Sequence, residues 1–368
     1  MSRKKVIIVG QLPPPIHGQS VAIERIAKIQ SDEYEILSLP LNCSTDIESV
    51  GSFQLKKIFI TLVVSFKLMR MCFGSKNVLV YYPPASPAVI PVLRDLMFFV
   101  IARLGARRWI FHFHAGGLPE FLNSRWWGFL AKWIYPSPKL NISMSKDSEL
   151  TPGKFFGGED VYIPYGLEVP LQFEARGHLR PLRLLYLGNL FISKGVEMCL
   201  RALKSLRDQG HDLHLDLVGG DVERDRDRIK EIVNELELAE HATFHGVQSG
   251  DPKWECFKLA DCFVFPSHYP AEKFPNVLIE ALGAGLPVVT THWRGIPELV
   301  GTDCTGSTLV DIHDQAGFEK GILDVIRASD ETYASYRKAS RARFVQKYTL
   351  DKFNDSVLAA FSKCFTGC

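Results

Sequence analysis

One stretch of the chain decides its fold: residues 265–289, which read FPSHYPAEKFPNVLIEALGAGLPVV. Its first apolar residues are typical of the end of a buried strand, and a polar loop carrying Glu272 follows. Pro275 suits the first position of a helix, because a proline there gives up no hydrogen bond. The Gly-Ala-Gly sequence that ends this helix allows a tight turn into a second apolar strand. The stretch therefore predicts a strand, a loop, a helix and a strand, which is the repeating unit of a parallel α/β sheet.

The start of this helix is a candidate anion-binding site. There the main-chain N–H groups of Asn276, Val277 and Leu278 are expected to lack intrahelical acceptors, with the positive end of the helix dipole behind them. Such groups can bind the diphosphate of a nucleotide. Glu280 lies about 7.5 Å beyond Pro275 along the helix axis, where its carboxylate can accept hydrogen bonds from a ribose diol.

The same alternation of strands and helices runs through both halves of the chain. Several of the strand-like runs are apolar on both faces, as in parallel strands covered by helices. Strands are expected at residues 6–10, 34–39, 77–82, 108–114, 139–145, 161–164, 182–187, 214–218, 242–245, 262–266 and 287–291. Helices are expected at residues 18–30, 54–71, 87–104, 120–134, 194–209, 223–238 and 253–260, from near 275, and over most of 313–365.

This pattern predicts an α/β protein built from two doubly wound domains that face each other across a cleft. The N-terminal domain is expected at residues 1–168 and the C-terminal domain at residues 182–349. Residues 169–181, which contain proline and glycine, are interpreted as the linker. The last helix, at about 350–368, is expected to pack back on the first domain.

The spacing of Glu272 and Glu280, in this strand–loop–helix context, resembles the E-x7-E signature of the retaining glycosyltransferases of the GT-B fold, family 4. The resemblance implies two Rossmann-like domains, of which the second binds a nucleoside diphosphate sugar. It also implies transfer of the sugar with retention of configuration, without a covalent enzyme intermediate, a further cofactor or a metal ion. Glu272 then serves as a catalytic residue beside the sugar. Phe274, Asn276, Val277, Leu278 and Glu280 are then expected to bind the nucleotide sugar.

A second segment carries the resemblance further. Residues 187–195, LGNLFISKG, are similar to the segment in which this family uses an arginine and a lysine on the donor diphosphate. Lys194 matches the lysine and is expected to be catalytic. Asn189 stands where the arginine is usual; its amide can bind phosphate but supplies no charge, which leaves more of the neutralisation to Lys194 and the helix amides.

Two segments of the first half complete the candidate site. In residues 9–20, VGQLPPPIHGQS, the main chain at Gly18 is expected to approach phosphate, and His17 is either a donor contact or a loop residue. His114 aligns with a histidine that similar enzymes place beside the transferring sugar. His112 shares its strand face and is interpreted as a core histidine, with a metal-binding pair as the weaker alternative.

Two features of the sequence are not assigned a role in the candidate site. Tyr165 stands where the family usually has asparagine, and no role is predicted for it. Asp225 and Asp227 have the spacing of the metal-binding aspartate pair of another transferase fold. Their charges alternate with basic residues, which is typical of a solvated helix face.

Charge is divided unevenly along the chain. Residues 1–180 contain 21 Lys and Arg against 14 Asp and Glu, whereas residues 181–368 contain 22 against 27. The basic half suits an anionic surface, although no apolar run approaches the roughly 20 residues of a membrane span. A helix at 54–71 would place its exposed basic residues on one side. It is either a core helix with snorkelling lysines or an interfacial helix on anionic lipid.

Together these observations predict a transferase that acts on a glycan acceptor, expected to be lipid-linked, in the synthesis of bacterial surface polysaccharide. The expected partners are a nucleotide sugar, this acceptor and an anionic membrane surface, with no nucleic acid because no recognition motif is present. The expected location is the cytoplasm, at the inner face of the plasma membrane. Eight scattered cysteines without a CxxC pair agree with a reducing compartment. A soluble acceptor and a GT-B nucleotide-sugar epimerase remain as alternatives.

Overall fold

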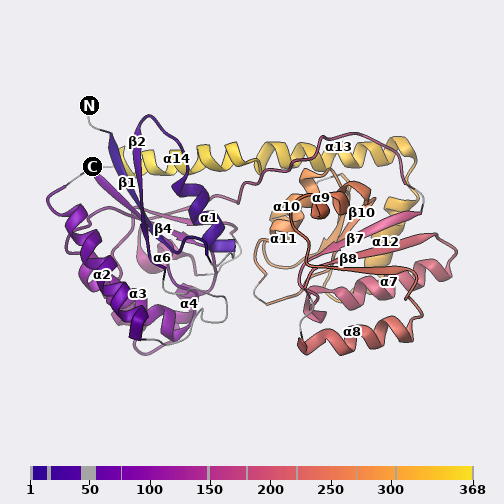
Figure 1. The fold of residues 1–368 in the computed structure, drawn as a ribbon, viewed down its shortest axis with the longest axis horizontal. Helices are drawn as coiled ribbons and strands as arrows, with labels where there is room; N and C mark the ends of the chain where they lie inside the picture. The colour runs from indigo at the N-terminus through magenta and orange to yellow at the C-terminus, as the bar shows by residue number, and fades with distance from the viewer. Residues whose placement is uncertain are drawn as a thin grey trace. The chain divides into compact units, whose positions relative to one another are not determined.

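The computed structural model describes residues 3–14, 18–42, 55–75, 77–146, 150–179, 181–220, 223–270, 272–302 and 305–366. The chain forms two compact units (Figure 1). Unit 1 comprises Met1–Tyr165 together with Asp351–Cys368, and unit 2 comprises Gly166–Leu350. The chain therefore leaves the first unit once and returns to it at its end.

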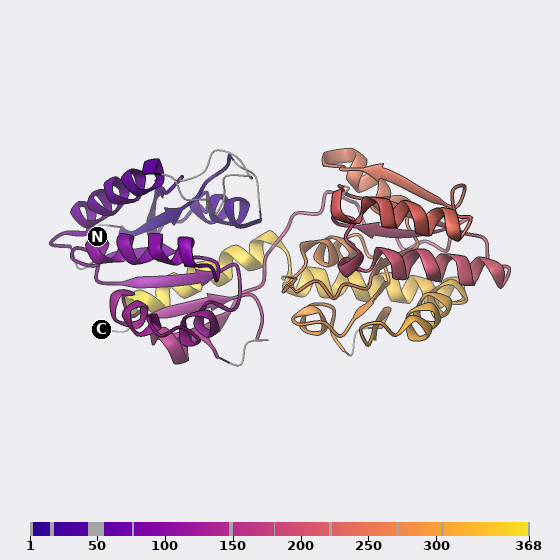
Figure 2. The ribbon, with the colours of Figure 1, turned by 90° about the horizontal axis from the view of Figure 1, so that it is seen from below.

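Unit 1 is built on a parallel six-stranded sheet with the strand order β2-β1-β3-β4-β5-β6, and helices cover both of its faces (Figure 2). Its strands are β1 (Lys4–Gly10), β2 (Tyr34–Pro40), β3 (Val78–Tyr82), β4 (Trp109–Phe113), β5 (Leu140–Ser143) and β6 (Glu159–Tyr162). Its helices are α1 (Gly18–Ala27), α2 (Leu55–Cys72), α3 (Val89–Ala102), α4 (Leu118–Asn123), α5 (Gly128–Ile134), α6 (Pro152–Phe156) and α14 (Leu350–Thr366). Every residue of β3 and β4 is buried, as the apolar runs at these positions predict.

A buried carboxylate ties α3 to the sheet in unit 1. Asp95 is fully buried and accepts hydrogen bonds from the hydroxyls of Tyr82 (2.7 Å) and Tyr135 (3.0 Å). It also accepts from the main-chain N–H of Ala85 (2.8 Å) and pairs with Arg94 (2.8 Å). These four partners satisfy the charge, which would otherwise be unfavourable in the core.

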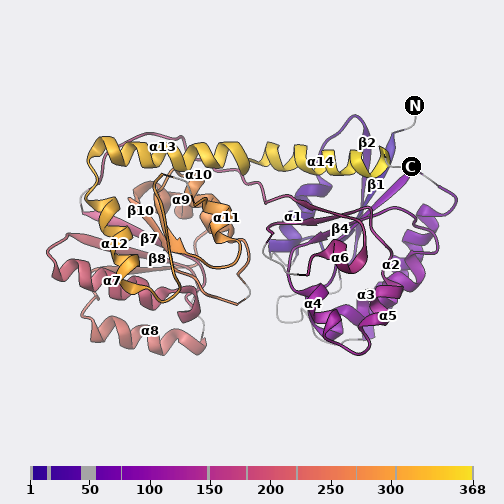
Figure 3. The same ribbon diagram turned by 180° about the vertical axis from the view of Figure 1, so that it is seen from behind.

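The last helix contributes to the core of unit 1. The rings of Phe361 and Phe365 on α14 lie 6.0 and 5.9 Å from the ring of Tyr34 at the start of β2. Lys363, on α14 (Figure 3), forms an ion pair with Glu159 on β6. Unit 1 is therefore assembled from the two ends of the sequence.

Unit 2 is a second parallel six-stranded sheet, with the order β12-β11-β10-β7-β8-β9. Its strands are β7 (Leu182–Leu187), β8 (Leu213–Val218), β9 (Ala242–Gly246), β10 (Cys262–Phe265), β11 (Val288–Thr291) and β12 (Ser307–Val310). Its helices are the 3-10 turn η1 (Ile192–Lys194), α7 (Val196–Asp208), α8 (Glu223–Glu235), α9 (Gly250–Leu259), α10 (Asn276–Gly283), α11 (Ile296–Val300), α12 (Gln315–Ile326) and α13 (Asp330–Lys347). The strand order reverses between β7 and β10, and a ligand of such a sheet binds beyond the carboxyl ends of the strands at this point.

The structure differs from the sequence prediction at several elements. The helix expected at 120–134 is two helices, α4 and α5, because the chain turns between them and Gly128 lies against the carbonyl of Leu122. A Cβ atom on Gly128 would lie 1.9 Å from that oxygen. Three short elements, α6, α11 and β12, were not predicted, since five residues or fewer carry little periodicity. In the described part of the chain, no helix has both the length and the apolarity needed to cross a bilayer.

Candidate functional site

The floor of the candidate site in unit 2 is a close approach of two main chains. Gly188 follows β7 and Gly219 follows β8, and a Cβ atom on Gly219 would lie 1.8 Å from the carbonyl oxygen of Gly188. Only glycine fits there, so the two loops cross at the carboxyl end of the sheet. Asn189, the next residue, has an exposed side chain at this edge.

A short turn after this crossing positions Lys194. The sequence predicts that a helix begins at Lys194, but this residue ends the 3-10 turn η1, because Gly195 adopts a left-handed conformation (φ 88°) and α7 begins only after it. A Cβ atom on Gly195 would lie 2.4 Å from the carbonyl oxygen of Pro266, so the turn packs directly on the end of β10. At the start of the turn, the main-chain N–H of Ile192 donates to Oδ2 of Asp225 (3.0 Å). The predicted solvated face is thus wrong for Asp225, which is half-buried and holds the turn, whereas Asp227 is exposed.

Lys194 and Glu272 form an ion pair. The Nζ atom of Lys194 lies 2.9 Å from Oε2 of Glu272, and the two side chains are 17% and 14% exposed. The ammonium also lies 5.5 Å from the ring centre of Tyr269, which stacks on Phe191 at 5.4 Å. The two residues that the sequence predicted to be catalytic in unit 2 therefore meet, one from the loop after β7 and the other from the loop after β10.

The loop that carries Glu272 is fixed where it leaves β10. The N–H of His268 donates to the carbonyl of Ser193 (2.9 Å), which joins this loop to the Lys194 turn. Thr290 and Thr291 on β11 donate their hydroxyls to the carbonyls of residues 265 and 267, at 2.7 and 2.5 Å. Within the loop, the N–H of Glu272 donates to the carbonyl of Tyr269 (2.9 Å), so Glu272 is positioned by a loop that is anchored to the sheet.

The helix after this loop differs from the prediction by one residue. Pro275 is the N-cap of α10 (φ −70°, ψ 118°) and the helix begins at Asn276. The prediction that the N–H of Leu278 has no acceptor is wrong, because it donates to the carbonyl of Pro275 (3.1 Å) and closes a 3-10-type first turn. No described residue accepts a hydrogen bond from the N–H groups of Asn276 and Val277, and Oδ1 of Asn276 is buried without a partner among those residues. The ring of Phe274 is buried, and its centre lies 6.2 Å from that of the Tyr348 ring. The part of Phe274 that can contact a ligand is therefore its main chain.

A second ion pair lies at Glu280, and the sequence analysis missed it. Nζ of Lys253, on α9, lies 3.0 Å from Oε1 of Glu280, and the side chains are 19% and 14% exposed. The same ammonium lies 4.3 Å from the ring centre of Trp254. Lys253 stands in a segment without a recognisable motif, and its approach to Glu280 arises only when β10 brings α9 and α10 together. Both carboxylates of the E-x7-E pattern are therefore matched by a lysine.

In unit 1, four side chains form a connected cluster at the carboxyl end of the sheet. The hydroxyl of Tyr81 lies 2.8 Å from Nδ1 of His112 and 3.3 Å from Nε2 of His114. The Tyr165 hydroxyl is hydrogen-bonded to Nδ1 of His114, and the two imidazole rings stack with centres 4.2 Å apart. We call these four residues the His–Tyr cluster.

Burial controls the ionisation of this cluster. His112 is fully buried, as expected for a core histidine, and burial holds its pKa well below the ordinary value. Burial also raises the pKa of the Tyr81 and Tyr165 hydroxyls, so both phenols keep their protons. In the described part of the chain, no three His, Cys, Asp or Glu side chains are arranged to hold a metal ion.

The remaining predicted residue of unit 1 is Gly18, which is the first residue of α1. His17 lies outside the described residues. Tyr81 and Tyr165 were not predicted to be parts of the site. Tyr81 lies on another strand and Tyr165 lies 51 positions after His114, and nothing in the sequence indicates that both contact the His114 ring.

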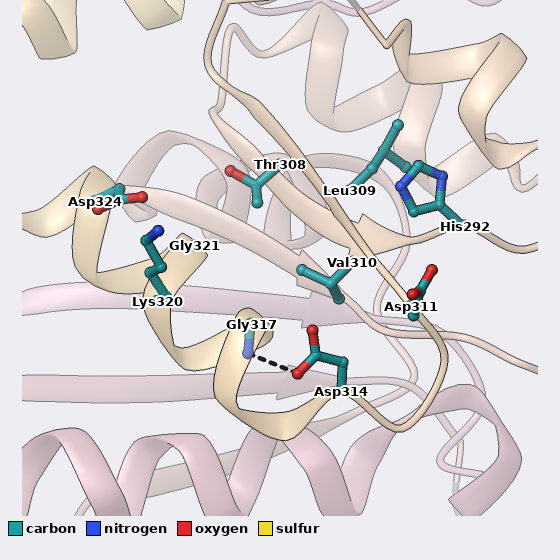
Figure 4. A pocket seen from close by; sticks show the side chains of 10 residues that line it. All are labelled: His292, Thr308, Leu309, Val310, Asp311, Asp314, Gly317, Lys320, Gly321 and Asp324. Carbon is teal, nitrogen blue, oxygen red and sulfur yellow. Dashed lines mark hydrogen bonds between the residues drawn. The ribbon is translucent and has the colours of Figure 1, made fainter.

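An open pocket of about 340 Å³ lies at the β12 edge of unit 2 (Figure 4). Asp311, Asp314 and Asp324 line it together with Lys320, and Asp314 accepts a hydrogen bond from the N–H of Gly317 (2.9 Å) as the cap of α12. None of the predicted site residues lines this pocket, so it is separate from the Lys194–Glu272 pair.

Comparison with known proteins extends this picture. Residues 171–343 match the family described as glycosyl transferases group 1. The chain is 30% identical over 201 residues to the putative colanic acid biosynthesis glycosyltransferase WcaL of Escherichia coli, covering 53% of this chain and 44% of that protein. It is 31% identical over 217 residues to the glycogen synthase of Mycobacterium tuberculosis, covering 58% and 50%. The chain thus spans half or less of the length of these curated relatives.

Solved structures agree over the whole chain. The sucrose-phosphate synthase from Thermosynechococcus elongatus superposes with a TM-score of 0.71 at 17% identity, covering all of both chains. The Anabaena protein Alr3699/HepE, solved in complex with UDP, superposes with a TM-score of 0.71 at 18% identity, covering 97% of this chain and 99% of that one. This likeness confirms the predicted fold class: α/β, with two doubly wound parallel sheets of the GT-B type.

Proposed function

We propose that the chain, whose residues 171–343 match the family described as glycosyl transferases group 1, transfers a sugar from a nucleoside diphosphate sugar to a hydroxyl of a glycan acceptor. The configuration at the anomeric carbon is retained. The observation that carries the proposal is the Lys194–Glu272 pair, formed by two loops that meet where the strand order of unit 2 reverses.

The chemistry follows from the charges at this edge. The leaving group is a nucleoside diphosphate, on which negative charge grows as the bond to the sugar breaks. The ammonium of Lys194 and the N–H groups of Asn276 and Val277 are placed to bind the phosphate oxygens and stabilise that charge. When phosphate binds Lys194, the carboxylate of Glu272 becomes available to accept hydrogen bonds from the hydroxyls of the sugar.

Glu280 completes the donor site at its nucleoside end. Its carboxylate can accept hydrogen bonds from the two ribose hydroxyls, while the ion pair with Lys253 orients it. The Anabaena relative was solved with UDP-glucose, and this supports a uridine diphosphate sugar as the first donor to test.

Binding and turnover test this proposal. UDP-, GDP- and ADP-sugars are screened by thermal shift, since a ligand present at a hundred times its Kd stabilises a protein by about 2.7 kcal/mol. The sugar that binds is then incubated with candidate acceptors, and nucleoside diphosphate is measured. We expect its release to require an acceptor and to be lost in Lys194→Ala. Interconversion of the sugar without any acceptor would assign the protein to the epimerases instead.

The acceptor is proposed to be lipid-linked and presented at an anionic membrane, and the outer surface of unit 1 supports this. Helices α2 and α3 pack side by side, and α5 adjoins the end of α3 (Figure 3). The large apolar side chains that these elements leave exposed include Phe59, Val63 and Phe66 on α2, Ile90, Leu93 and Val100 on α3, and Trp126, Phe129 and Trp133 at α5. We call this set the apolar surface of unit 1.

Helix α2 has a buried face, as expected of a core helix, and its other face supports the interpretation as an interfacial helix. One face of α2 is buried through Val64 and Leu68, whereas the opposite face exposes aromatic side chains. Helix α2 contains four Lys or Arg residues and no acidic residue, and the only acid of α3 is the buried Asp95. Exposed aromatic rings among basic residues match the interface of an anionic bilayer, where rings enter the headgroup layer and basic groups meet phosphate.

Vesicle co-sedimentation tests this surface. We expect binding to vesicles that contain an anionic phospholipid, weaker binding at high salt, and little binding to zwitterionic vesicles. Trp126→Ser, at an 85% exposed position, should weaken binding about tenfold. Val247→Ser is the matched control, because Val247 is 77% exposed but lies in unit 2. Equal binding to both kinds of vesicle, or none, would favour a soluble acceptor.

A further inference from the structure

The His–Tyr cluster is a hydrogen-bonded chain whose proton positions can be derived. Its members follow in the order Tyr165, His114, Tyr81 and His112, with three hydrogen bonds between them. Each link needs one hydrogen atom, and each neutral imidazole carries a single N–H. Burial keeps both phenols protonated and His112 neutral. For neutral imidazoles, two arrangements of the protons fill all three links with every donor pointing the same way along the chain. A third, in which both imidazoles donate to the Tyr81 oxygen, keeps His114 as the Nε2–H form but leaves the Tyr81 proton and Nε2 of His112 unsatisfied.

In the first arrangement every donor points toward His112. The Tyr165 hydroxyl donates to Nδ1 of His114, Nε2–H of His114 donates to the Tyr81 oxygen, and the Tyr81 hydroxyl donates to Nδ1 of His112. His112 then carries its proton on Nε2, which is buried without a hydrogen-bond partner. This arrangement leaves one buried donor unsatisfied.

In the second arrangement every donor points toward Tyr165. The Nε2 atom of His112 is then a buried acceptor without a donor. The Tyr165 hydroxyl proton is also left over, because among the described residues Nδ1 of His114 is its one hydrogen-bond partner and would already carry a proton. Two buried groups are unsatisfied instead of one, which disfavours this arrangement by about tenfold.

We propose that Tyr165 is a positioning residue: by donating its hydroxyl proton to Nδ1 of His114, it fixes this imidazole as the Nε2–H tautomer and makes His114 a hydrogen-bond donor. The link that His114 forms through Nε2 is the longest in the chain, at 3.3 Å to the Tyr81 oxygen, while Tyr81 has a shorter bond of 2.8 Å to His112. The Nε2–H of His114 is therefore held loosely. A sugar hydroxyl or phosphate oxygen can replace the Tyr81 oxygen as its acceptor.

This inference rests on the proposed function for the nature of the ligand, but not for the tautomer. A neutral N–H donor orients a substrate oxygen and does not remove a proton from it. His114 would thus bind and orient the ligand through Nε2, and it would not act as a general base. Tyr165 acts through His114 and needs no contact with the substrate.

Nuclear magnetic resonance of the whole protein tests the tautomer directly. The chain is labelled with ¹⁵N-histidine, and the ring nitrogens of His114 are assigned by their loss in His114→Gln. In the native protein at neutral pH, we expect Nε2 of His114 to carry the proton and Nδ1 to be bare. In Tyr165→Phe the Nδ1–H form should become populated, because the donor that fixed the ring is gone. A native His114 with its proton on Nδ1, or an unchanged spectrum in Tyr165→Phe, would overturn the proposal.

Kinetics test the positioning role separately. We expect Tyr165→Phe to lower kcat about 10–100-fold, as for other groups that orient a functional histidine, with the KM for the nucleotide sugar changed less than twofold. Tyr34→Phe is the matched control, since it removes a tyrosine hydroxyl at the opposite, amino end of the unit 1 sheet. Normal kcat in a Tyr165→Phe protein with an altered His114 spectrum would refute the positioning role. If no donor sugar reacts with the native protein, the proposed function fails while the spectra still decide the tautomer.

Discussion

In unit 2 the polar groups of the candidate site are arranged as two ion pairs, whereas in unit 1 they are arranged as a chain of neutral hydroxyls and imidazoles. Lys194–Glu272 and Lys253–Glu280 bring opposite charges to 2.9 and 3.0 Å at a partly exposed sheet edge. The His–Tyr cluster contains no carboxylate, ammonium or guanidinium group, and burial keeps His112 neutral. The difference agrees with the proposed function, in which the diphosphate of the donor requires cations and an uncharged sugar hydroxyl requires a donor of fixed direction.

The largest expected effect concerns the charged site. Lys194→Ala should lower kcat with the identified nucleotide sugar about 10²–10³-fold, because a lost donor to a developing negative charge has this effect in other enzymes. Release of nucleoside diphosphate measures it. Lys258→Ala is the control, since this exposed lysine is paired with Glu255 at 3.3 Å and should leave kcat unchanged. Near-normal turnover in Lys194→Ala would mean that the ion pair serves the fold alone.

The next effect concerns Asp95, the buried carboxylate that ties α3 to the sheet of unit 1. Asp95→Asn should lower the free energy of unfolding by about 2–3 kcal/mol, because an NH₂ group would face the N–H of Ala85 and the hydroxyl of Tyr135. Urea unfolding measures it, with the exposed Asp32→Asn as the control. If Asp95→Asn instead lowered kcat at unchanged stability, this charge would belong to the site and the comparison between the units would fail.

A smaller effect is expected at the second ion pair. Lys253→Met keeps the aliphatic length but removes the positive charge beside Glu280, so the carboxylate is oriented less firmly and the ribose is held less well. We expect the KM for the nucleotide sugar to rise about fivefold, which corresponds to about 1 kcal/mol, while kcat changes less than twofold. Steady-state kinetics separate the two parameters. A fall in kcat without a change in KM would place Lys253 near the reacting bond and not at the nucleoside.

The smallest effect is a pH dependence of stability in unit 1. His112 has a pKa well below the ordinary value in the folded protein, so below about pH 6.5 the unfolded chain binds a proton that the folded chain does not. Stability therefore falls as the pH falls, and His112 should contribute about 1 kcal/mol of that loss between pH 6.5 and 5.5. His112→Phe should flatten the dependence in urea unfolding at the two pH values. An equal slope in both proteins would show that His112 is accessible to protons in the native state.

The fold could be predicted from the sequence because the patterns that indicate strands and helices are local and recur along the chain. Apolar runs located eleven of the strands, and only β12, with half-buried residues at three of its four positions, lacked a recognisable pattern. At the site, spacing along one segment placed Glu272 beside α10, and the family resemblance supplied its partner Lys194. Lys253, Tyr81 and Tyr165 were beyond this reach, because each meets its partner only through the order of strands or helices that lie far apart in the chain.

The details of the helix start show a second limit. Proline is common at the first residue of a helix and also at the residue before it. The two positions differ in the backbone angle ψ, which at Pro275 is 118° and therefore not helical. That shift lets the carbonyl of Pro275 accept from Leu278 and removes one of the three N–H groups offered to phosphate. The N–H groups of Asn276 and Val277 remain without an acceptor among the described residues, so the proposed phosphate site has two such donors and not three.

Helix α14 has a consequence for how the protein is made. Because Phe361 and Phe365 are packed against Tyr34, the unit that the ribosome synthesises first lacks part of its core until the last residues emerge. Unit 2 is contiguous in the chain and can fold while still attached to the ribosome. A chain cut before residue 351 would therefore contain all of unit 2 but would lack the part of the unit 1 core that α14 supplies.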